Sequence, residues 1–231
     1  WQFPVIIDNM MNLELLCRAT EFSGDKRFYD MAISHADKTM ENHFRPDYSC
    51  YHVVNYDTIS GHALQKCTWQ GYSDESVWSR GQSWALYGYT MMYRETKQPR
   101  YLEQAKHIAS FLLNHPKMPQ DKIPYWDFDD PKVPDALRDA SAAAIMASAL
   151  LELSGYVDKV TGQGYITVAE TQLRTLASDE YLAKPGENCN FILKHSVGFL
   201  PQNSEVDVPL TYADYYFVEA LMRYRAMHLK E

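Results

Sequence analysis

The segment Arg27-Phe-Tyr-x-x-Ala32-x-x-x-Ala36 returns 73 residues later as Arg100-Tyr-Leu-x-x-Ala105-x-x-x-Ala109, and a weaker copy begins at Tyr165. Small and aromatic residues three and four positions apart give each copy one apolar face, which is typical of an amphipathic helix. Each copy follows a more strongly apolar helical segment. The repeat is too long for the common short helical repeats. The pattern therefore favours apolar inner helices that alternate with half-polar outer helices in a double ring.

Helical periodicity dominates the chain, and the alternation typical of strands is scarce. The pattern predicts seven helices, four inner and three outer, at about residues 4–16, 26–42, 77–95, 100–114, 136–156, 165–177 and 212–228. Two long irregular segments, 44–76 and 178–209, separate some of them, and the first is rich in aromatic residues, which argues against disorder. We therefore predict an all-α fold of the (α/α)6-barrel class.

The predicted ring is incomplete, because a closed ring of six helical hairpins needs about twelve helices and about five would have to precede Trp1. Residues 1–231 are expected to form the C-terminal part of one domain whose N-terminal helices are missing. Its two open edges would expose apolar side chains to water. We expect either a chain that supplies the N-terminal helices or a homodimer to cover them, and we expect residues 1–231 alone to be poorly folded and inactive.

The composition is typical of a soluble globular protein, with 46% apolar and 23% charged residues. A net charge of −8 argues against a nucleic-acid partner, which requires a basic surface. The longest apolar run, Ala142–Leu151, is too short to cross a membrane. The four cysteines are expected to be free thiols. The eight histidines show no metal-binding spacing, so no catalytic metal and no cofactor are predicted.

Asp8 is the one carboxylate near the start of an apolar stretch, Pro4–Leu16. If this stretch is a helix that begins near Pro4, Asp8 shares a face with Met11 and Leu15. A carboxylate there is unfavourable unless it is paired, hydrogen-bonded or protonated. Asp8 is then either a structural residue bonded to nearby backbone or a functional acid whose pKa is raised by desolvation.

Arg80 and Trp84 are one helical turn apart, where a long loop leads into an inner helix. Such an arginine can bind a carboxylate while the tryptophan stacks on a sugar ring. The alternative is an ion pair in the core beside a packing tryptophan. On the first interpretation, replacing Arg80 with alanine weakens substrate binding with little effect on the fold. Gly81 and Gly88 indicate close packing of this helix, and Ser76 is expected to cap it.

Five motifs spread along the whole chain resemble those of the unsaturated glucuronyl hydrolases of glycoside hydrolase family 88. They are Asp8-Asn-Met-Met-Asn, Gln70-Gly-Tyr-x-Asp74-x-Ser-x-Trp78-x-Arg80-Gly-Gln-x-Trp84, Pro124-Tyr-Trp-Asp-Phe-Asp, Arg138-Asp-Ala-Ser-Ala-Ala-Ala and Asp207-Val-Pro-Leu-x-Tyr212-Ala-Asp-Tyr-Tyr. Each motif is short, but the combination is specific. The resemblance implies the six-hairpin α/α barrel that the repeat also predicts.

The resemblance further implies an enzyme that removes a 4,5-unsaturated uronic acid from the non-reducing end of oligosaccharides made by polysaccharide lyases, here of the glycosaminoglycan type. The implied reaction hydrates the C4=C5 double bond, with Asp8 as general acid and base. The positions implied to bind substrate are His52, Thr68, Gln70, Trp78, Arg80, Trp84 and Tyr212. Residues 1–231 would then be one catalytic domain of a soluble protein in the periplasm or cytoplasm of a bacterium.

The sequence departs from the family pattern in three places. Trp69 stands where the family usually has histidine, and Lys66 where it commonly has glycine, which leaves the substrate subclass open. A second essential aspartate, expected upstream of Asp8, is absent from these residues. Alternative functions are an unsaturated rhamnogalacturonyl hydrolase, a sugar epimerase on the same ring, and a non-catalytic glycan-binding half-barrel.

Overall fold

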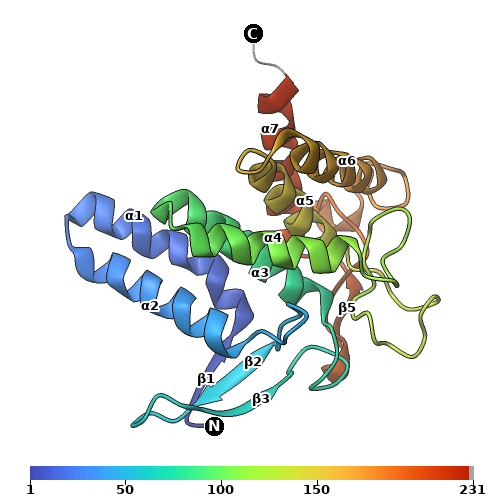
Figure 1. The fold of residues 1–231 in the computed structure, drawn as a ribbon. Coiled ribbons are helices and arrows are strands. Elements are labelled where there is room, and N and C mark those ends of the chain that lie inside the picture. Colours follow the sequence, from blue (N-terminus) through green and yellow to red (C-terminus); the bar gives the residue numbers. More distant parts are fainter. Residues whose placement is uncertain (229–231) are drawn as a thin grey trace.

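Seven α-helices make up about half of the computed structural model, which describes residues 1–228 (Figure 1). They are α1 (Leu13–Ser23), α2 (Lys26–Asn42), α3 (Ser79–Thr96), α4 (Pro99–Leu113), α5 (Ala140–Ser154), α6 (Lys159–Leu176) and α7 (Thr211–His228). α3 and α5 are buried nearly all round, whereas α2, α4 and α6 each bury one face. The predicted all-α class is confirmed, and so is the alternation of apolar and half-polar helices.

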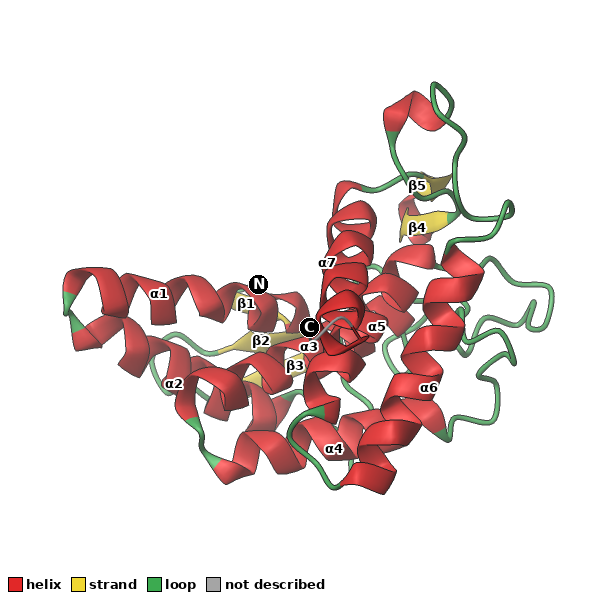
Figure 2. Cartoon of the chain, turned by 90° about the horizontal axis from the view of Figure 1, so that it is seen from above, coloured by secondary structure: helices red, strands yellow, loops and turns green. Residues whose placement is uncertain are grey.

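The helices follow one another around an arc. α3 packs against α4 and α5, α5 packs against α6 and α7, and α1 packs against α2 and α3. Seen from above, α1, α3, α5 and α7 form the inner side of the arc, while α2, α4 and α6 lie outside it (Figure 2). α1 and α7 lie at its two ends. The alanine-rich sequence of α5 allows its neighbours to approach closely, and nearly all of its residues are buried.

The helix predicted over residues 4–16 is wrong in its first half. Phe3–Ile6 form an edge strand, β1, and Ile7–Asn12 form a 3₁₀ helix, η1, so that α1 begins only at Leu13. The β-branched run from Val5 to Ile7 favours the strand. Pro4 lies in that strand rather than in a first helical turn, which an edge strand tolerates because one side of it needs no hydrogen-bond donor.

Strands also occupy both segments that were predicted to be irregular. β2 (Val53–Tyr56) and β3 (Ala63–Cys67) complete a three-stranded antiparallel sheet in the order β1-β2-β3. Ser196–Phe199 and Ser204–Val208 form a second pair, the β4–β5 hairpin. The strands are short, and every residue of β2 is buried. A strand buried on both faces shows no apolar–polar alternation, so the sequence pattern missed it.

Several helices begin at other residues than predicted, because capping side chains that are not part of the apolar pattern determine where a helix starts. Ser76 does not cap α3; its hydroxyl instead donates to Asp127 over 2.6 Å. Asp139 caps α5 by accepting from the backbone N–H of Ser141. Asp158 caps α6 in the same way, so that this helix begins at Lys159, six residues before the predicted start at Tyr165. These caps satisfy backbone N–H groups that the helices leave unpaired.

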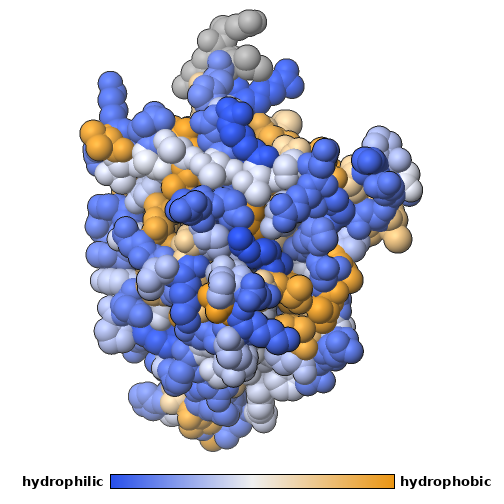
Figure 3. Space-filling model, turned by 90° about the vertical axis from the view of Figure 1, so that its right-hand side faces the viewer, coloured by the Kyte–Doolittle hydropathy of each residue, from blue (hydrophilic) through white to orange (hydrophobic). Residues whose placement is uncertain are grey.

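The face shown in Figure 3 is mostly hydrophilic. On this face, apolar side chains lie in separate patches among polar ones. Within residues 1–228, no helix is long and apolar enough to cross a bilayer. The prediction of free thiols is confirmed for all four cysteines: Cys17, Cys50, Cys67 and Cys189.

Candidate active site

Asp8 lies in the first turn of η1, which packs directly on α3. Gly88 of α3 makes this contact possible, because a Cβ atom there would lie only 2.4 Å from Cβ of Met10. A Cβ atom at Gly81 would lie 2.7 Å from the ring of Trp78. The close packing predicted from both glycines is confirmed. It places the carboxyl group of Asp8 beside the first turns of α3.

The carboxyl group of Asp8 is largely desolvated. Its side chain is 22% exposed, and its Oδ2 atom is buried without a hydrogen-bond partner among the described residues. Burial raises the pKa of Asp8 to about 6, although the charge of Arg80 and hydrogen bonds to the backbone and to Trp84 act in the opposite direction. This upward shift agrees with the second interpretation of Asp8, that of an acid in a desolvated position. Asp8 can therefore change its protonation state near neutral pH.

His52 faces Asp8 across a gap of 3.6 Å between Nε2 and Oδ2. Its Nδ1 atom accepts the backbone N–H groups of Trp69, at 3.1 Å, and Gln70, at 3.2 Å. Because Nδ1 is an acceptor, the ring proton of the neutral imidazole resides on Nε2. Burial lowers the pKa of His52 to about 3, so the ring is neutral at pH 7.

The gap between Asp8 and His52 is longer than a hydrogen bond. Nε2 of His52, like Oδ2 of Asp8, is buried and has no partner in the described chain. Buried polar atoms without partners are rare in proteins. A donor N–H and a carboxylate oxygen thus converge on one position, where a hydroxyl group or a water molecule could bond to both.

Arg80 is only 2% exposed and is held inside the protein. Its Nη1 atom lies 3.3 Å from Oδ2 of Asp139 and also donates to the carbonyl of Val197, while Nη2 donates to the carbonyl of Gly198 over 2.8 Å. The core ion pair, one of the two interpretations of Arg80, therefore describes its contacts in residues 1–228. Asp139 was missed as its partner, although an aspartate directly before an apolar helical run is a typical N-cap residue.

Three aromatic rings surround Arg80 and Asp8. The guanidinium group of Arg80 lies 4.5 Å from the ring centre of Trp78 and 5.4 Å from that of Tyr212. The rings of Trp84 and Tyr212 are 6.0 Å apart, and the rings of His52 and Trp78 are 4.4 Å apart. After Oδ2 of Asp8 and Nε2 of His52, Nε1 of Trp78 is the third atom of this cluster that is buried and has no partner in the described chain. The structure thus brings most of the predicted site residues together.

Gln70 and Thr68 lie at the edge of this cluster. Nε2 of Gln70 donates to the carbonyl of Gly198 over 3.0 Å, which links its loop to the β4–β5 hairpin. Oγ1 of Thr68 accepts the backbone N–H of Gly71 over 2.8 Å, and its own N–H donates to Asp74. The contacts of Thr68 therefore stabilise a turn.

A groove of about 660 Å³ opens beside the cluster, and its size is within the range of small-molecule sites. It is lined by Trp1, Pro4, Ile6, Asn9, His52, Val53, Trp69 and Gln70. A larger groove of about 870 Å³ lies between the three-stranded sheet and α2 and contains none of the predicted site residues. The smaller groove, which includes His52 and Gln70, is the one that adjoins the reactive groups. Residues 1–228 contain no group of three or more potential ligands that could hold a metal ion.

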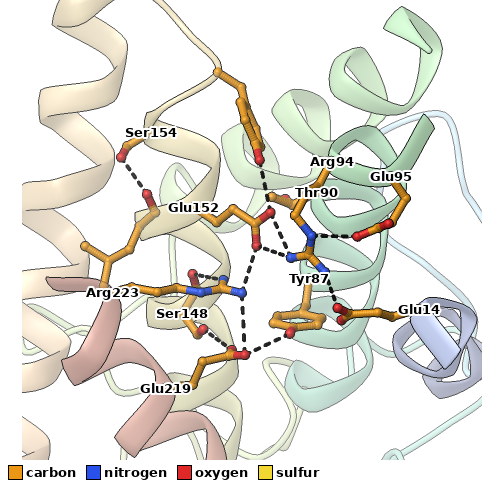
Figure 4. Close-up of polar contacts among 12 residues, drawn as sticks. Glu14, Tyr87, Thr90, Arg94, Glu95, Ser148, Glu152, Ser154, Glu219 and Arg223 are labelled. Carbon is orange, nitrogen blue, oxygen red and sulfur yellow. Dashed lines mark hydrogen bonds and ion pairs between the residues drawn. The ribbon is translucent and has the colours of Figure 1, made fainter. Parts of the chain in front are cut away.

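Charged side chains also gather at the other end of the inner helices (Figure 4). Arg94 of α3 contacts Glu14, Glu95 and Glu152 at 2.7–2.9 Å. Arg223 of α7 lies 2.8 Å from Glu152. This network joins α1, α3, α5 and α7, and the sequence pattern did not reveal it.

Comparison with known proteins identifies relatives of the chain. It matches the model of Glycosyl Hydrolase Family 88 over residues 1–222. It is 54% identical over 230 residues to an unsaturated glucuronyl hydrolase of Formosa agariphila, covering 100% of this chain and 57% of that protein.

Solved structures of unsaturated glucuronyl hydrolases also match this chain. The crystal structure of an unsaturated glucuronyl hydrolase specific for heparin matches with a TM-score of 0.96 and 59% identity, covering 99% of this chain and 61% of that one. A variant from Streptococcus agalactiae complexed with dGlcA-GalNAc6S matches with a TM-score of 0.83 and 32% identity, covering 95% of this chain and 58% of that one. The α/α-barrel class predicted from the repeat is confirmed. The chain spans less than two thirds of each of these relatives, from 57% to 61%, and over that span it belongs to Glycosyl Hydrolase Family 88.

Proposed function

We propose that the protein containing this chain is a glycoside hydrolase that removes a 4,5-unsaturated uronic acid from the non-reducing end of lyase-generated oligosaccharides of the glycosaminoglycan type. The observation that carries the proposal is the buried carboxyl group of Asp8, whose pKa is raised to about 6 and whose Oδ2 atom faces Nε2 of His52 without a partner in residues 1–228. The activities of the relatives support it.

The proposed reaction hydrates the C4=C5 double bond. Protonated Asp8 donates its proton to C4, a new C4–H bond forms, and positive charge develops at C5. Water attacks C5, and the Asp8 carboxylate accepts the proton that the water loses. The product is a hemiketal, which opens and releases the rest of the oligosaccharide. Asp8 returns to its protonated form, so the cycle consumes only water.

One group can act first as acid and then as base only if its pKa lies near the working pH. Desolvation provides this for Asp8. Neutral His52 is proposed to donate its Nε2–H to the substrate or to the attacking water. A neutral donor beside the carboxyl group leaves the pKa of Asp8 high, whereas a cationic one would lower it.

The remaining site residues are proposed to bind the unsaturated uronate. Trp84 and Tyr212, whose rings lie 6.0 Å apart, are proposed to form aromatic walls, and Trp78 is proposed to donate its unpartnered indole N–H. Gln70 is proposed to contact the sugar at the groove, with Thr68 supporting the turn beside it. Arg80 remains a predicted contact for the substrate carboxylate. Because Asp139 already pairs with Arg80, the substrate would share this guanidinium group.

The test is the Asp8→Asn variant of the full-length protein, assayed by the loss of ultraviolet absorbance of the conjugated double bond in an unsaturated disaccharide. The proposal requires that the wild type removes this absorbance and that the variant does not. Binding of the disaccharide without turnover by the wild type would favour a glycan-binding module instead. Epimerisation of a saturated sugar that survives the substitution would favour an epimerase.

We further propose that the outward apolar surfaces of α1 and α7 are covered in the whole protein, by helices of another segment or by a second copy. Leu15 on α1 is 73% exposed, and Tyr215 and Met222 on α7 are also exposed. Large exposed apolar patches mark interaction surfaces. Size-exclusion chromatography and thermal melting of residues 1–231, compared with the full-length protein, test this. A monomeric fragment that melts cooperatively and is active would contradict it.

A further inference from the structure

A buried glutamine of α3, Gln82, bonds to the backbone of Cys50 with both polar atoms of its side-chain amide. Its Oε1 atom accepts the N–H of Cys50 over 3.0 Å, and its Nε2 atom donates to the carbonyl of Cys50 over 3.1 Å. Gln82 is completely buried and Cys50 is 2% exposed, so bulk water cannot replace these bonds. The amide therefore ties the segment that precedes β2 to α3.

The backbone geometry of this segment explains why it needs Gln82. Phe44 and Cys50 face each other in an isolated antiparallel bridge. The hydrogen bonds of that bridge come from the residues on either side, such as the N–H of Tyr51, which donates to the carbonyl of His43 over 2.8 Å. The N–H and carbonyl groups of Cys50 therefore point away from Phe44, and Gln82 bonds to them as a neighbouring strand would.

The tie at Cys50 bears on both reactive groups of the candidate active site. His52 lies only two residues further on, and its carbonyl accepts the N–H of Ile7, the residue before Asp8, over 2.9 Å. Ile7 in turn packs on α3 beside Gln82, because a Cβ atom at Gly81 would lie 3.2 Å from Cγ2 of Ile7. One buried helix thus holds the two segments whose side chains leave the gap of 3.6 Å between Asp8 and His52.

We propose that Gln82 is a positioning residue of the reaction, which holds the segment from Cys50 to His52 on α3 and so keeps Nε2 of His52 opposite the carboxyl group of Asp8. The proposal rests on the proposed function, because this spacing matters for activity only if both groups act on one substrate. Gln82 works through the backbone of Cys50 and takes no part in the proton transfers. Without it the segment moves, and water enters between Asp8 and His52.

The pH dependence of catalysis can report this change, because the other groups around Asp8 do not titrate near pH 6. In residues 1–228 these groups are Arg80, His52, Cys50 and Tyr212. Burial lowers the pKa of His52 to about 3 and raises the pKa of the Cys50 thiol and of the Tyr212 hydroxyl, so all three are neutral. Arg80 stays charged throughout.

The first measurement does not depend on activity. It follows the alkylation of cysteines by iodoacetamide in the native full-length protein, with mass spectrometry of the peptides. Gln82→Met keeps the length of the side chain and removes both bonds, so it should label Cys50 about tenfold faster. Cys17 and Cys67, which are also buried, should keep their wild-type rates, and the exposed Cys189 is the internal reference. Global destabilisation would instead accelerate all three buried thiols together.

The second measurement is the pH dependence of kcat/KM for an unsaturated disaccharide. In the wild type, kcat/KM should decrease above about pH 6, where Asp8 loses its proton. In Gln82→Met the decrease should begin about one pH unit lower, because water stabilises the charged form of Asp8, and kcat/KM at pH 7 should be about tenfold lower. A smaller folded fraction alone would lower the activity without moving this midpoint.

The matched control is Gln172→Met on α6. Gln172 is also completely buried, and its Nε2 atom donates to the carbonyl of Lys122 over 3.0 Å, outside the candidate active site. The control should change neither the labelling of Cys50 nor the pH midpoint. If Gln82→Met does not fold, Gln82→Asn takes its place. Its amide is one methylene shorter and reaches only one of the two backbone groups, so both changes should appear at smaller size.

Three outcomes decide the proposal. An active variant with wild-type labelling of Cys50 and a wild-type pH midpoint would overturn the positioning role and leave the proposed function intact. Equal acceleration of all three buried thiols with an unchanged midpoint would also overturn it. Selective labelling of Cys50 in Gln82→Met, together with a wild type that leaves the disaccharide intact, would overturn the proposed function while supporting the tie between Gln82 and the segment.

Discussion

Two arginines on α3 lie in contrasting surroundings at opposite ends of the helix, about 21 Å apart by the rise of an α-helix. Arg80 is 2% exposed and pairs with one carboxylate, Asp139, and two carbonyl groups. The side chain of Arg94 is 24% exposed and meets three glutamates. Burial by itself would lower the pKa of Arg94, but Glu152 and its neighbours outweigh burial and raise it.

The difference lies in which polar atoms are left without partners. Every charged group around Arg94 is paired, and none of them is among the buried unpartnered atoms of residues 1–228. Near Arg80, by contrast, Asp8, His52 and Trp78 each keep a buried polar atom without a partner there. A fully paired network holds helices together, whereas converging unpartnered atoms indicate a ligand site. The Arg80 end is therefore interpreted as functional and the Arg94 end as structural.

The largest expected effect comes from Asp8→Asn, which removes the proton that is transferred. Turnover of an unsaturated disaccharide should fall by about 10²–10⁴-fold, the usual contribution of a general acid–base group. The measurement is kcat/KM in the full-length protein. Glu152→Gln, at the other end of the helices, is the control and should keep the wild-type rate per folded molecule. A similar loss in both variants would break the distinction between the two ends.

Arg80→Ala should destabilise the fold strongly, by about 3–5 kcal/mol, because it leaves Asp139 buried and unpaired. The sequence-based expectation of little effect on the fold is thus revised, since Arg80 is fully buried. Urea unfolding measures the change. Asp139→Asn combined with Arg80→Met should restore part of the stability. An Arg80→Ala variant with a wild-type unfolding midpoint would show that the buried Arg80–Asp139 pair does not contribute to stability.

The stability of the protein should depend on pH through Asp8. The pKa is about 6 in the folded chain and 3.8 as a model value, so between these values the folded state holds more protons than the unfolded state. The free energy of unfolding therefore decreases as pH rises through this window, by about 3 kcal/mol in total. Asp8→Asn should be more stable than the wild type above about pH 6 and no more stable near pH 3.

Urea unfolding of both proteins across this pH range checks the prediction. Curves that stay parallel from pH 3 to about pH 8 would show that the Asp8 carboxyl group is not desolvated. The titration of Asp8 should also determine how kcat/KM depends on pH. We expect kcat/KM to decrease tenfold per pH unit above about pH 6, because only protonated Asp8 can begin the reaction.

The smallest expected effect is that of Glu152→Gln on stability. The substitution keeps the size of the side chain and removes one charge that both Arg94 and Arg223 contact. We expect a loss of about 1–3 kcal/mol, the usual range for hydrogen bonds to charged groups. A double-mutant cycle with Arg223→Met measures the coupling between the two residues. A coupling near zero would mean that the network contributes little to joining the inner helices.

The sequence by itself determined the order of the helices and their division into inner and outer sets. Ala32, Ala36, Ala105 and Ala109 repeat on buried faces because helical periodicity reports which side of each helix meets the core. The sequence also identified Asp8 as a candidate functional residue, because a carboxylate in an apolar run is unfavourable unless it is paired, hydrogen-bonded or protonated. Gly88 indicated that another segment packs closely against its helix, but the sequence did not show that this segment contains Met10.

Only the tertiary structure decided what surrounds Asp8. His52 is 44 residues away in the sequence, and Arg80 and Asp139 are 59 residues apart, so no local pattern encodes these contacts. β1 and β2 exist because they pair with each other, and each is too short to show a period. Long-range packing therefore desolvates Asp8, neutralises His52 and places Trp69 at the groove, since pKa and exposure depend on neighbours that the fold brings together.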